Sequence, residues 1–154
     1  MSSIYETILY SINLDSGIAT ITLNRPERLN AINMKMPQEL KHAVDVSNSD
    51  SSVRVIVVKG SGPGFCAGYD LVEYAEGKRG VMIGSQAGAY DPLPDYYWMS
   101  KCTECFMSLF HSHKPTIAQV HGACVAGGSD IALCADFVIM SDDAKIGYPP
   151  ARVC

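Results

Sequence analysis

The stretch that most constrains this chain is residues 114–136, KPTIAQVHGACVAGGSDIALCAD. Its first part, Thr116–Val120, is an apolar run that predicts a short buried strand. Small residues follow as far as Gly127 and Gly128, and the apolar spacing after this pair predicts a helix. A strand that turns into a helix through glycines lets a ligand approach the main chain and points unpaired N–H groups toward it. The stretch is therefore either a ligand site or a tightly packed turn.

Asp130 lies in the first turn of that expected helix. The positive end of the helix dipole favours a negative charge there, and the carboxylate is within reach of a group bound over the glycines. The simpler interpretation is that Asp130 only caps the helix. The residue is therefore a candidate acid or base whose role depends on what else reaches the same place.

A second strand also ends in a glycine turn. Residues 53–59, VRVIVVK, are apolar nearly throughout, which predicts a strand buried on both faces. The sequence GSGPGFCAGYDL follows, and a helix is expected to begin near Asp70. The turn lacks the lysine of a phosphate-binding loop and the spacing of a dinucleotide-binding turn. Two such units, each a strand, a glycine turn and a helix, predict an α/β fold.

Two glycine turns of this kind can converge on one site. If each presents one backbone N–H group to the same oxygen atom, they form an oxyanion hole, in which each donor is worth about 3–4 kcal/mol. Chemistry that builds negative charge on a thioester oxygen needs such a pair of donors. The approach of the two turns is therefore the main test of a catalytic function.

The pattern of apolar residues in the rest of the chain predicts further strands, two longer helices and a long loop. The helix at 95–111 is expected to pack through Phe106, Leu109 and Phe110, and the strand at 137–140 is expected to be buried. Residues 77–94 form a glycine-rich loop that is either a lid or an idle surface insertion. The other expected elements are strands at 7–14 and 18–23, a helix at 36–47 and an extended piece at 144–147.

Composition and charge exclude several classes of partner. The formal net charge of −4 favours neither nucleic acid nor an anionic membrane. No apolar run approaches the roughly 20 residues of a membrane span. The first residues, MSSIYETILY, lack the basic and apolar segments of a signal peptide. A globular cytoplasmic protein with reduced cysteines is therefore expected.

Cys102 and Cys105 form a C-x-x-C pair, and His111 and His113 follow it. Together they could be drawn as a zinc site or a redox pair. The His-x-His spacing is unusual for a zinc finger, and the sequence has no second C-x-x-C. These residues are better explained as parts of one packed helix and the turn after it, so no metal is expected.

Three segments, in order along the chain, resemble the crotonase (enoyl-CoA hydratase/isomerase) superfamily over essentially the whole sequence. They are ITLNRP with the following Asn30 and Ala31, FCAGYDL at 65–71, and the 114–136 stretch. The resemblance implies a crotonase-like spiral of ββα turns in a single core domain, residues 1–154, which is incomplete before the C-terminal helical region of the family. It implies an acyl-CoA thioester as substrate, with CoA as part of that substrate rather than a separate cofactor. It also implies a homo-oligomer, a trimer or hexamer, for a full-length protein.

The resemblance also assigns site residues. It implies that the N–H groups of Tyr69 and Gly127 form an oxyanion hole for a thioester enolate, and that Asp130 is the acid/base residue. It implies that the segments around these residues bind CoA, through Arg28, Ala31, Cys66, Ala67, Gly68, Asp70, Leu71 and Gly128. Asp70 is in addition expected to cap the helix that it begins.

One position departs from the family pattern. Hydratases use a second glutamate shortly after an Ala-Lys strand, and Pro150 stands at its place here. Proline can neither accept nor donate a proton, so water addition by two carboxylates is not supported. Isomerisation, dehydration or proton transfer alpha to the thioester remains open. A non-catalytic CoA-binding or assembly protein is the main alternative, and a thiol-redox or metal protein is a more distant one.

Overall fold

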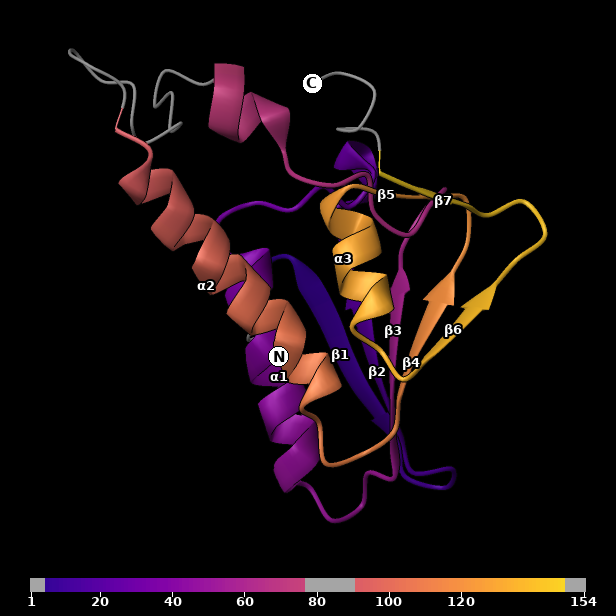
Figure 1. Ribbon diagram of the computed structural model, residues 1–154. Coiled ribbons are helices and arrows are strands. Elements are labelled where there is room, and N and C mark those ends of the chain that lie inside the picture. The colour runs from indigo at the N-terminus through magenta and orange to yellow at the C-terminus, as the bar shows by residue number, and fades with distance from the viewer. Residues whose placement is uncertain (1–4, 77–90, 149–154) are drawn as a thin grey trace.

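The computed structural model describes residues 5–76 and 91–148, and its largest element is a five-stranded sheet (Figure 1). The strands pair in the order β1-β2-β3-β4-β6. β1 runs antiparallel to β2, and the other neighbouring strands are parallel. The mixed α/β architecture expected from the sequence is confirmed. The five strands are β1 (Ile8–Asn13), β2 (Ile18–Leu23), β3 (Val55–Gly60), β4 (Thr116–Val120) and β6 (Phe137–Met140).

A smaller, two-stranded sheet pairs β5 (Ala123–Val125) in parallel with β7 (Lys145–Gly147). The sequence pattern predicts β7 as the extended piece at 144–147, but it does not predict β5. The helices are α1 (Met36–Ser49), α2 (Leu93–Phe110) and α3 (Gly127–Leu133), together with the 3-10 turn η1 (Pro26–Arg28) and the π-helical turn η2 (Val72–Glu76). The helix expected near Asp70 is thus a short π-helical turn.

α1 begins where the sequence supplies both a turn and an apolar stripe. The side-chain oxygen of Asn33 accepts the N–H of Met36 at 3.0 Å. Pro37 lies in the first turn, where its missing N–H costs no hydrogen bond. The buried face of the helix consists of Met36, Pro37, Leu40, Ala43, Val44 and Ser47. α1 and α2 lie side by side on one side of the main sheet (Figure 1), where α1 packs on β1 and β2 and α3 packs on β4 and β6.

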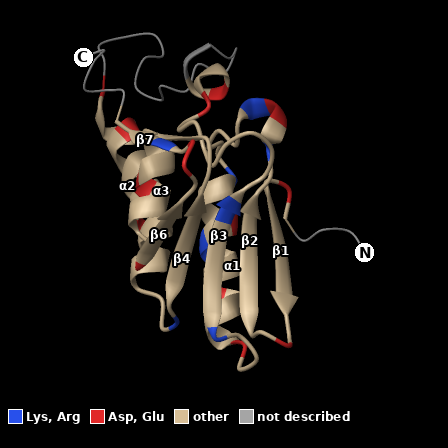
Figure 2. Cartoon of the chain, turned by 90° about the vertical axis from the view of Figure 1, so that its right-hand side faces the viewer, with Lys and Arg blue, Asp and Glu red and all other residues tan. Residues whose placement is uncertain are grey.

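The helices cover only one face of the main sheet. In Figure 2 they lie behind the strands, and the strands themselves are drawn almost wholly in tan because few of their residues are charged. Ile56 and Val58 of β3 are fully buried, whereas Val55 and Val57 on the other face are half-buried. The expectation that the 53–59 strand is buried on both faces is therefore wrong, since the described helices all pack on the same side.

Two further expectations about burial are wrong. In β6, Phe137 is 61% exposed and Ile139 is 59% exposed, because among the described residues β6 is an edge strand that pairs with β4 alone. In α2, Phe106 and Leu109 are buried as expected, but Phe110, the last helical residue, is 63% exposed. Both errors arise because burial depends on neighbours that the local pattern does not reveal.

Two of the features expected from the sequence involve residues outside the described ranges. The glycine-rich loop expected at 77–94 lies mostly within 77–90, and these residues, like Pro150, are outside the described ranges. Across the two described ranges, no helix is long and apolar enough to cross a bilayer.

Candidate active site

The two glycine turns lie side by side and are joined by main-chain hydrogen bonds. Cys66, in the turn after β3, pairs through its main chain with Cys124 of β5 in an isolated parallel β-bridge. The Cys66 N–H donates to the carbonyl of Ala123 at 3.0 Å, and the Val125 N–H donates to the carbonyl of Cys66 at 3.0 Å. The structure therefore brings together the two turns that the sequence singles out.

This close approach requires glycine at two positions. A Cβ atom added to Gly68 would lie 2.9 Å from the Cβ atom of Ala126, and the φ of +91° at Gly68 is one that other residues rarely adopt. A Cβ atom added to Gly128 would lie 2.4 Å from the carbonyl oxygen of Cys66. These glycines allow the two main chains to pack without a side chain between them.

The N–H group of Tyr69 points away from the pairing that fixes its segment. The main chains of Tyr69 and Ile32 pair in an isolated parallel β-bridge. The Ile32 N–H donates to the Gly68 carbonyl at 2.7 Å, and the Asp70 N–H donates to the Ile32 carbonyl at 3.0 Å. Since the residues on either side of Tyr69 make these bonds, its own N–H faces the opposite way. That N–H makes no hydrogen bond to any residue that the structure describes.

Gly127 presents a second unpaired N–H group. It is the first residue of α3, so no earlier turn of the helix supplies an acceptor. Within the described part of the chain, its N–H donates to no other group. A Cβ atom at Gly127 would lie 2.9 Å from Cε2 of the Tyr69 ring, so the two residues are in direct contact. Two residues with unpaired N–H groups, from separate turns, are thus in contact.

Ala126 fixes the start of α3. Its φ of 49° and ψ of −126° form an unusual conformation for a residue with a side chain. Its carbonyl accepts the Ser129 N–H at 2.8 Å and the Ser129 hydroxyl at 2.6 Å, which closes the first turn. Asp130 follows Gly127 by three residues and therefore lies on the same face of the helix.

Asp130 has the environment of a group that can exchange a proton. Its side chain is half-buried, and burial raises its pKa above the usual value. The pKa of the Tyr69 hydroxyl is also raised, mainly by burial and further by the charges of Cys102 and Asp130, so Asp130 lies within electrostatic range of Tyr69. No described residue donates a hydrogen bond to the Asp130 carboxylate. Such a carboxyl group is suited to general acid–base chemistry.

Aromatic rings pack beside these groups. The ring centroid of Trp98, on α2, lies 5.5 Å from that of Tyr69 and 4.7 Å from that of Tyr74. The neighbouring side chains of Tyr96 and Tyr97 are exposed. α2 therefore supplies an apolar surface next to Tyr69 through a single half-buried tryptophan.

A sequence model of the enoyl-CoA hydratase/isomerase family matches residues 13–153. This chain belongs to that family. The crystal structure of enoyl-CoA hydratase from Mycobacterium smegmatis is 46% identical to it, with a TM-score of 0.85, and the match covers 96% of this chain and 51% of that one. The membership and the crotonase-like fold expected from the sequence are therefore confirmed.

Relatives within the family catalyse different reactions. A mevalonyl-coenzyme A hydratase of Beauveria bassiana is 34% identical over 139 residues, which are 88% of this chain and 47% of that protein. A trans-2-decenoyl-[acyl-carrier-protein] isomerase of Streptococcus mutans is 30% identical over 141 residues, which are 92% of this chain and 49% of that protein. The chain thus spans about half the length of these curated relatives. Membership alone does not select between the two reactions.

The residues that the family resemblance assigns to CoA lie on segments that the structure joins. The Ala67 N–H donates to the Leu29 carbonyl at 3.0 Å and holds residues 28–31 against residues 66–71. The side chains of Arg28 and Leu71 are exposed, whereas Cys66 is fully buried against Gly128. Their contact with CoA stays a prediction.

The placement of Cys102 and Cys105 disfavours the thiol-redox and metal hypotheses. Both are buried free thiols of α2, and burial raises the pKa of Cys102 to about 12, so its reactive thiolate is suppressed. His111 and His113 are exposed at the end of the helix. Among the residues whose positions are described, no three His, Cys, Asp or Glu side chains are grouped to hold a metal ion.

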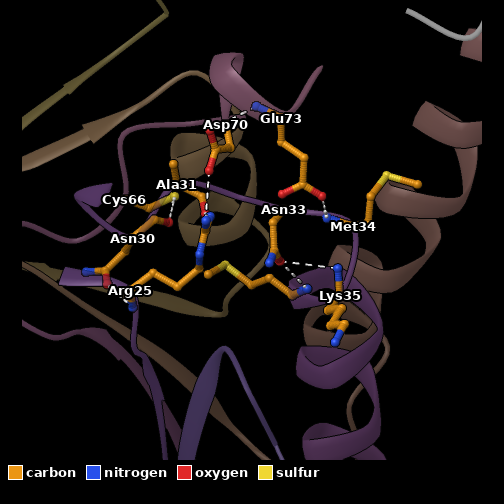
Figure 3. Close-up of polar contacts among 10 residues, drawn as sticks. Arg25, Asn30, Ala31, Asn33, Met34, Lys35, Cys66, Asp70 and Glu73 are labelled. Carbon is orange, nitrogen blue, oxygen red and sulfur yellow. Dashed lines mark hydrogen bonds and ion pairs between the residues drawn. The ribbon is translucent and has the colours of Figure 1, made fainter. Parts of the chain in front are cut away.

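Sequence reasoning missed the structural roles of Arg25 and Asn30. Arg25 forms an ion pair of 2.8 Å with Asp70, and Figure 3 shows it close to Asn30. The expected helix cap is confirmed, because Asp70 also accepts the Glu73 N–H at 3.3 Å. The motif ITLNRP contains Arg25, but a polar residue in a loop gives no sign of a partner so distant in the sequence.

Replacing Asn30 by alanine is expected to lower the free energy of unfolding by about 3 kcal/mol. The buried side chain donates to the carbonyls of Ser61 at 2.7 Å and Gly64 at 3.0 Å, and it accepts the Arg25 N–H at 2.9 Å. Each lost bond costs about 1 kcal/mol, and alanine is less tolerant than asparagine of the φ of 55° found here. Urea unfolding measures the loss.

Asn33→Ala is the matched control for this prediction. Within the described part of the chain, the Asn33 side chain accepts just two main-chain N–H groups at the start of α1, so its replacement should cost about 1 kcal/mol. Equal losses in the two variants would contradict the role given to Asn30.

Proposed function

We propose that the protein is an acyl-CoA hydratase/isomerase-type enzyme that stabilises a thioester enolate with the N–H groups of Tyr69 and Gly127 and moves a proton with Asp130. One observation carries the proposal. Tyr69 and Gly127, which come from separate turns and have unpaired N–H groups among the described residues, are in contact, and Asp130 follows Gly127 by three residues along α3. This is the set of groups that enolate chemistry requires.

The two donors would act on the thioester oxygen. Removing a proton from the carbon alpha to a thioester places negative charge on that oxygen, and N–H groups already in position stabilise it more than they stabilise the neutral substrate. Each such donor is worth about 3–4 kcal/mol in enzymes where one has been removed. The glycines at 68 and 128 support the site because they let the two turns, and hence the two donors, approach.

Asp130 would remove the alpha proton and return it to a second carbon or to a leaving group. Burial raises its pKa and so brings it closer to the working pH, where both the acid and the base form can take part. With Pro150 at the place of the second glutamate, one-carboxylate chemistry such as double-bond isomerisation is favoured over two-carboxylate addition of water.

Residues 28–31 and 66–71 are proposed to bind the CoA part of the substrate, with no separate cofactor. The hydrogen bonds that join these segments would give CoA a continuous main-chain surface next to Tyr69. A homo-oligomer of the full-length protein, which the resemblance implies, and a cytoplasmic location belong to the same proposal.

Proton exchange tests the enolate directly. The protein is incubated in D2O with butyryl-CoA, and deuterium at the alpha carbon is followed by NMR, while crotonyl-CoA and a 3-enoyl-CoA are assayed for turnover. Alpha-deuteration or turnover is the expected result. Absence of both with every acyl-CoA tested would contradict the enzyme proposal.

A non-catalytic CoA-binding or assembly protein is the second candidate, and Pro150 is the observation that favours it. Calorimetry with CoA and acetyl-CoA separates the two candidates. Binding without exchange or turnover supports the second candidate, and absence of binding contradicts both.

A further inference from the structure

Arg25 is a largely buried cation that connects two segments of the site. Its Nη2 atom lies 2.8 Å from a carboxylate oxygen of Asp70, and the two side chains are only 16% and 6% exposed. Its Nη1 atom donates to the Ala31 carbonyl at 2.5 Å. In Figure 3 the guanidinium lies between Ala31 and Asp70. One side chain therefore holds both the loop after β2 and the residue that follows Tyr69.

The contact with Ala31 begins a chain of peptide groups that ends at the Tyr69 N–H. The Ala31 carbonyl shares a peptide group with the Ile32 N–H, which donates to the Gly68 carbonyl at 2.7 Å. The Gly68 carbonyl in turn shares a peptide group with the Tyr69 N–H. In a trans peptide the C=O and N–H bonds point in opposite directions. Fixing each carbonyl therefore fixes the direction of the next N–H.

We propose that Arg25 is a positioning residue that orients and polarises the Tyr69 N–H through these two peptide groups, and that Asp70 holds the guanidinium in place. The inference rests on the proposed role of the Tyr69 N–H in stabilising an enolate. A charge at one end of a hydrogen-bond chain strengthens the bonds along it, by about 10–30% for each bond. Arg25 acts through the main chain rather than on the substrate.

The charge state of the pair supports this role. Burial alone would raise the pKa of Asp70, but hydrogen bonds from the Arg25 side chain and the Glu73 N–H, together with the charge of Arg25, outweigh it and lower the pKa. Asp70 is therefore ionised at neutral pH, and arginine is always protonated there. The guanidinium keeps its carboxylate partner under the conditions in which activity is measured.

Arg25→Met tests the inference, because methionine fills part of the space but removes the charge and both hydrogen bonds. The amide resonance of Tyr69 is followed in protein labelled with 15N-tyrosine, and kcat and KM are measured on the acyl-CoA substrate. We expect the Tyr69 amide resonance to shift and kcat to fall about tenfold with little change in KM. A purely structural role would lower the folded fraction without changing kcat per folded molecule.

Lys41→Met is the matched control. It breaks the exposed pair of 2.6 Å between Lys41 and Asp45 on α1, and it should leave both the Tyr69 resonance and kcat unchanged. Arg25→Lys keeps the charge but loses the planar fork that reaches two acceptors, so it should give an intermediate shift. If Arg25→Met does not fold, the Tyr69 amide resonance and kcat of Arg25→Lys are compared with those of the wild type instead.

A folded Arg25 variant whose Tyr69 resonance and kcat match those of the wild type overturns the inference. A wild-type protein without alpha-proton exchange or turnover contradicts the proposed function instead. In that case the tyrosine spectrum still decides whether Arg25 orients the Tyr69 N–H, so the two failures are distinguishable.

Discussion

Gly128→Ala is expected to lower the free energy of unfolding by about 4 kcal/mol, a large share of the roughly 5–15 kcal/mol that stabilises a typical domain. The added Cβ atom would lie 2.4 Å from the carbonyl oxygen and 2.8 Å from the Cβ atom of Cys66. Cys66 cannot move away cheaply, because its main chain is bonded to Ala123 and Val125 on β5. Overpacking of a tight site costs about 1–3 kcal/mol, and each broken main-chain bond adds about 1 kcal/mol.

Gly147→Ala is the matched control, since a Cβ atom at Gly147 would meet no atom of the described residues within 4 Å. Its free energy of unfolding should stay within about 0.5 kcal/mol of the wild type. Chemical denaturation followed by circular dichroism measures both variants. If Gly128→Ala is as stable as Gly147→Ala, the contact between the two turns is not as close as the structure places it.

The parts of the fold that the sequence predicts are those set by local pattern. The apolar alternation in β2 and the apolar stripe of α1 predict those elements within about two residues, because burial on one face imposes a fixed period. The two glycine turns are expected to be able to converge, and the structure brings them together at Gly68 and Gly128.

The sequence does not predict features that depend on a distant partner. β5 has only three residues, and it is a strand because β7 and the turn at Cys66 pair with it. β6 is apolar enough for a buried strand, yet it lies at the edge of the described sheet. The partner of Arg25 is Asp70, and neither residue marks the other in a single sequence.

In the candidate site too, the sequence predicts which residues take part but not the features that depend on distant partners. The helix pattern already marks Asp130 as a candidate, and the resemblance adds Tyr69 and Gly127. The structure adds that Tyr69 and Gly127 touch and that their N–H groups are unpaired among the described residues. The peptide groups that fix the direction of the Tyr69 N–H could not be predicted, because they depend on the bridge to Ile32. Motifs identify the residues, whereas the hydrogen-bond network decides how they point.

Asp130→Asn is expected to reduce kcat/KM for the acyl-CoA reaction by about 10²–10⁴-fold, the usual contribution of a general acid or base. The amide has nearly the same shape as the carboxylate but cannot take up the alpha proton at neutral pH. Steady-state kinetics and alpha-deuteration measure the loss. Asp142→Asn, which changes an exposed carboxylate in the turn after β6, is the control and should retain full activity.

The pH dependence of the wild-type kcat/KM should also show that Asp130 acts as the base. A base must be ionised, so kcat/KM should fall as the pH is lowered through the pKa of Asp130, which burial raises above its usual value. The acid limb should be absent from the residual rate of Asp130→Asn. An unchanged limb in that variant would assign the proton transfer to another group.

Stability should change in the opposite direction to activity. Because burial raises the pKa of Asp130 in the folded state, the ionised carboxylate destabilises the folded protein at neutral pH. As the pH falls through the raised pKa toward the ordinary value of 3.8, the group becomes protonated in the folded state and this penalty disappears. Asp130→Asn should therefore be more stable than the wild type at neutral pH, and the difference should shrink on acidification. If Asp130→Asn loses activity and gains stability, the substitution has removed a chemical group rather than a packing contact. If Asp130→Asn loses both activity and stability, Asp130 instead holds α3 in place.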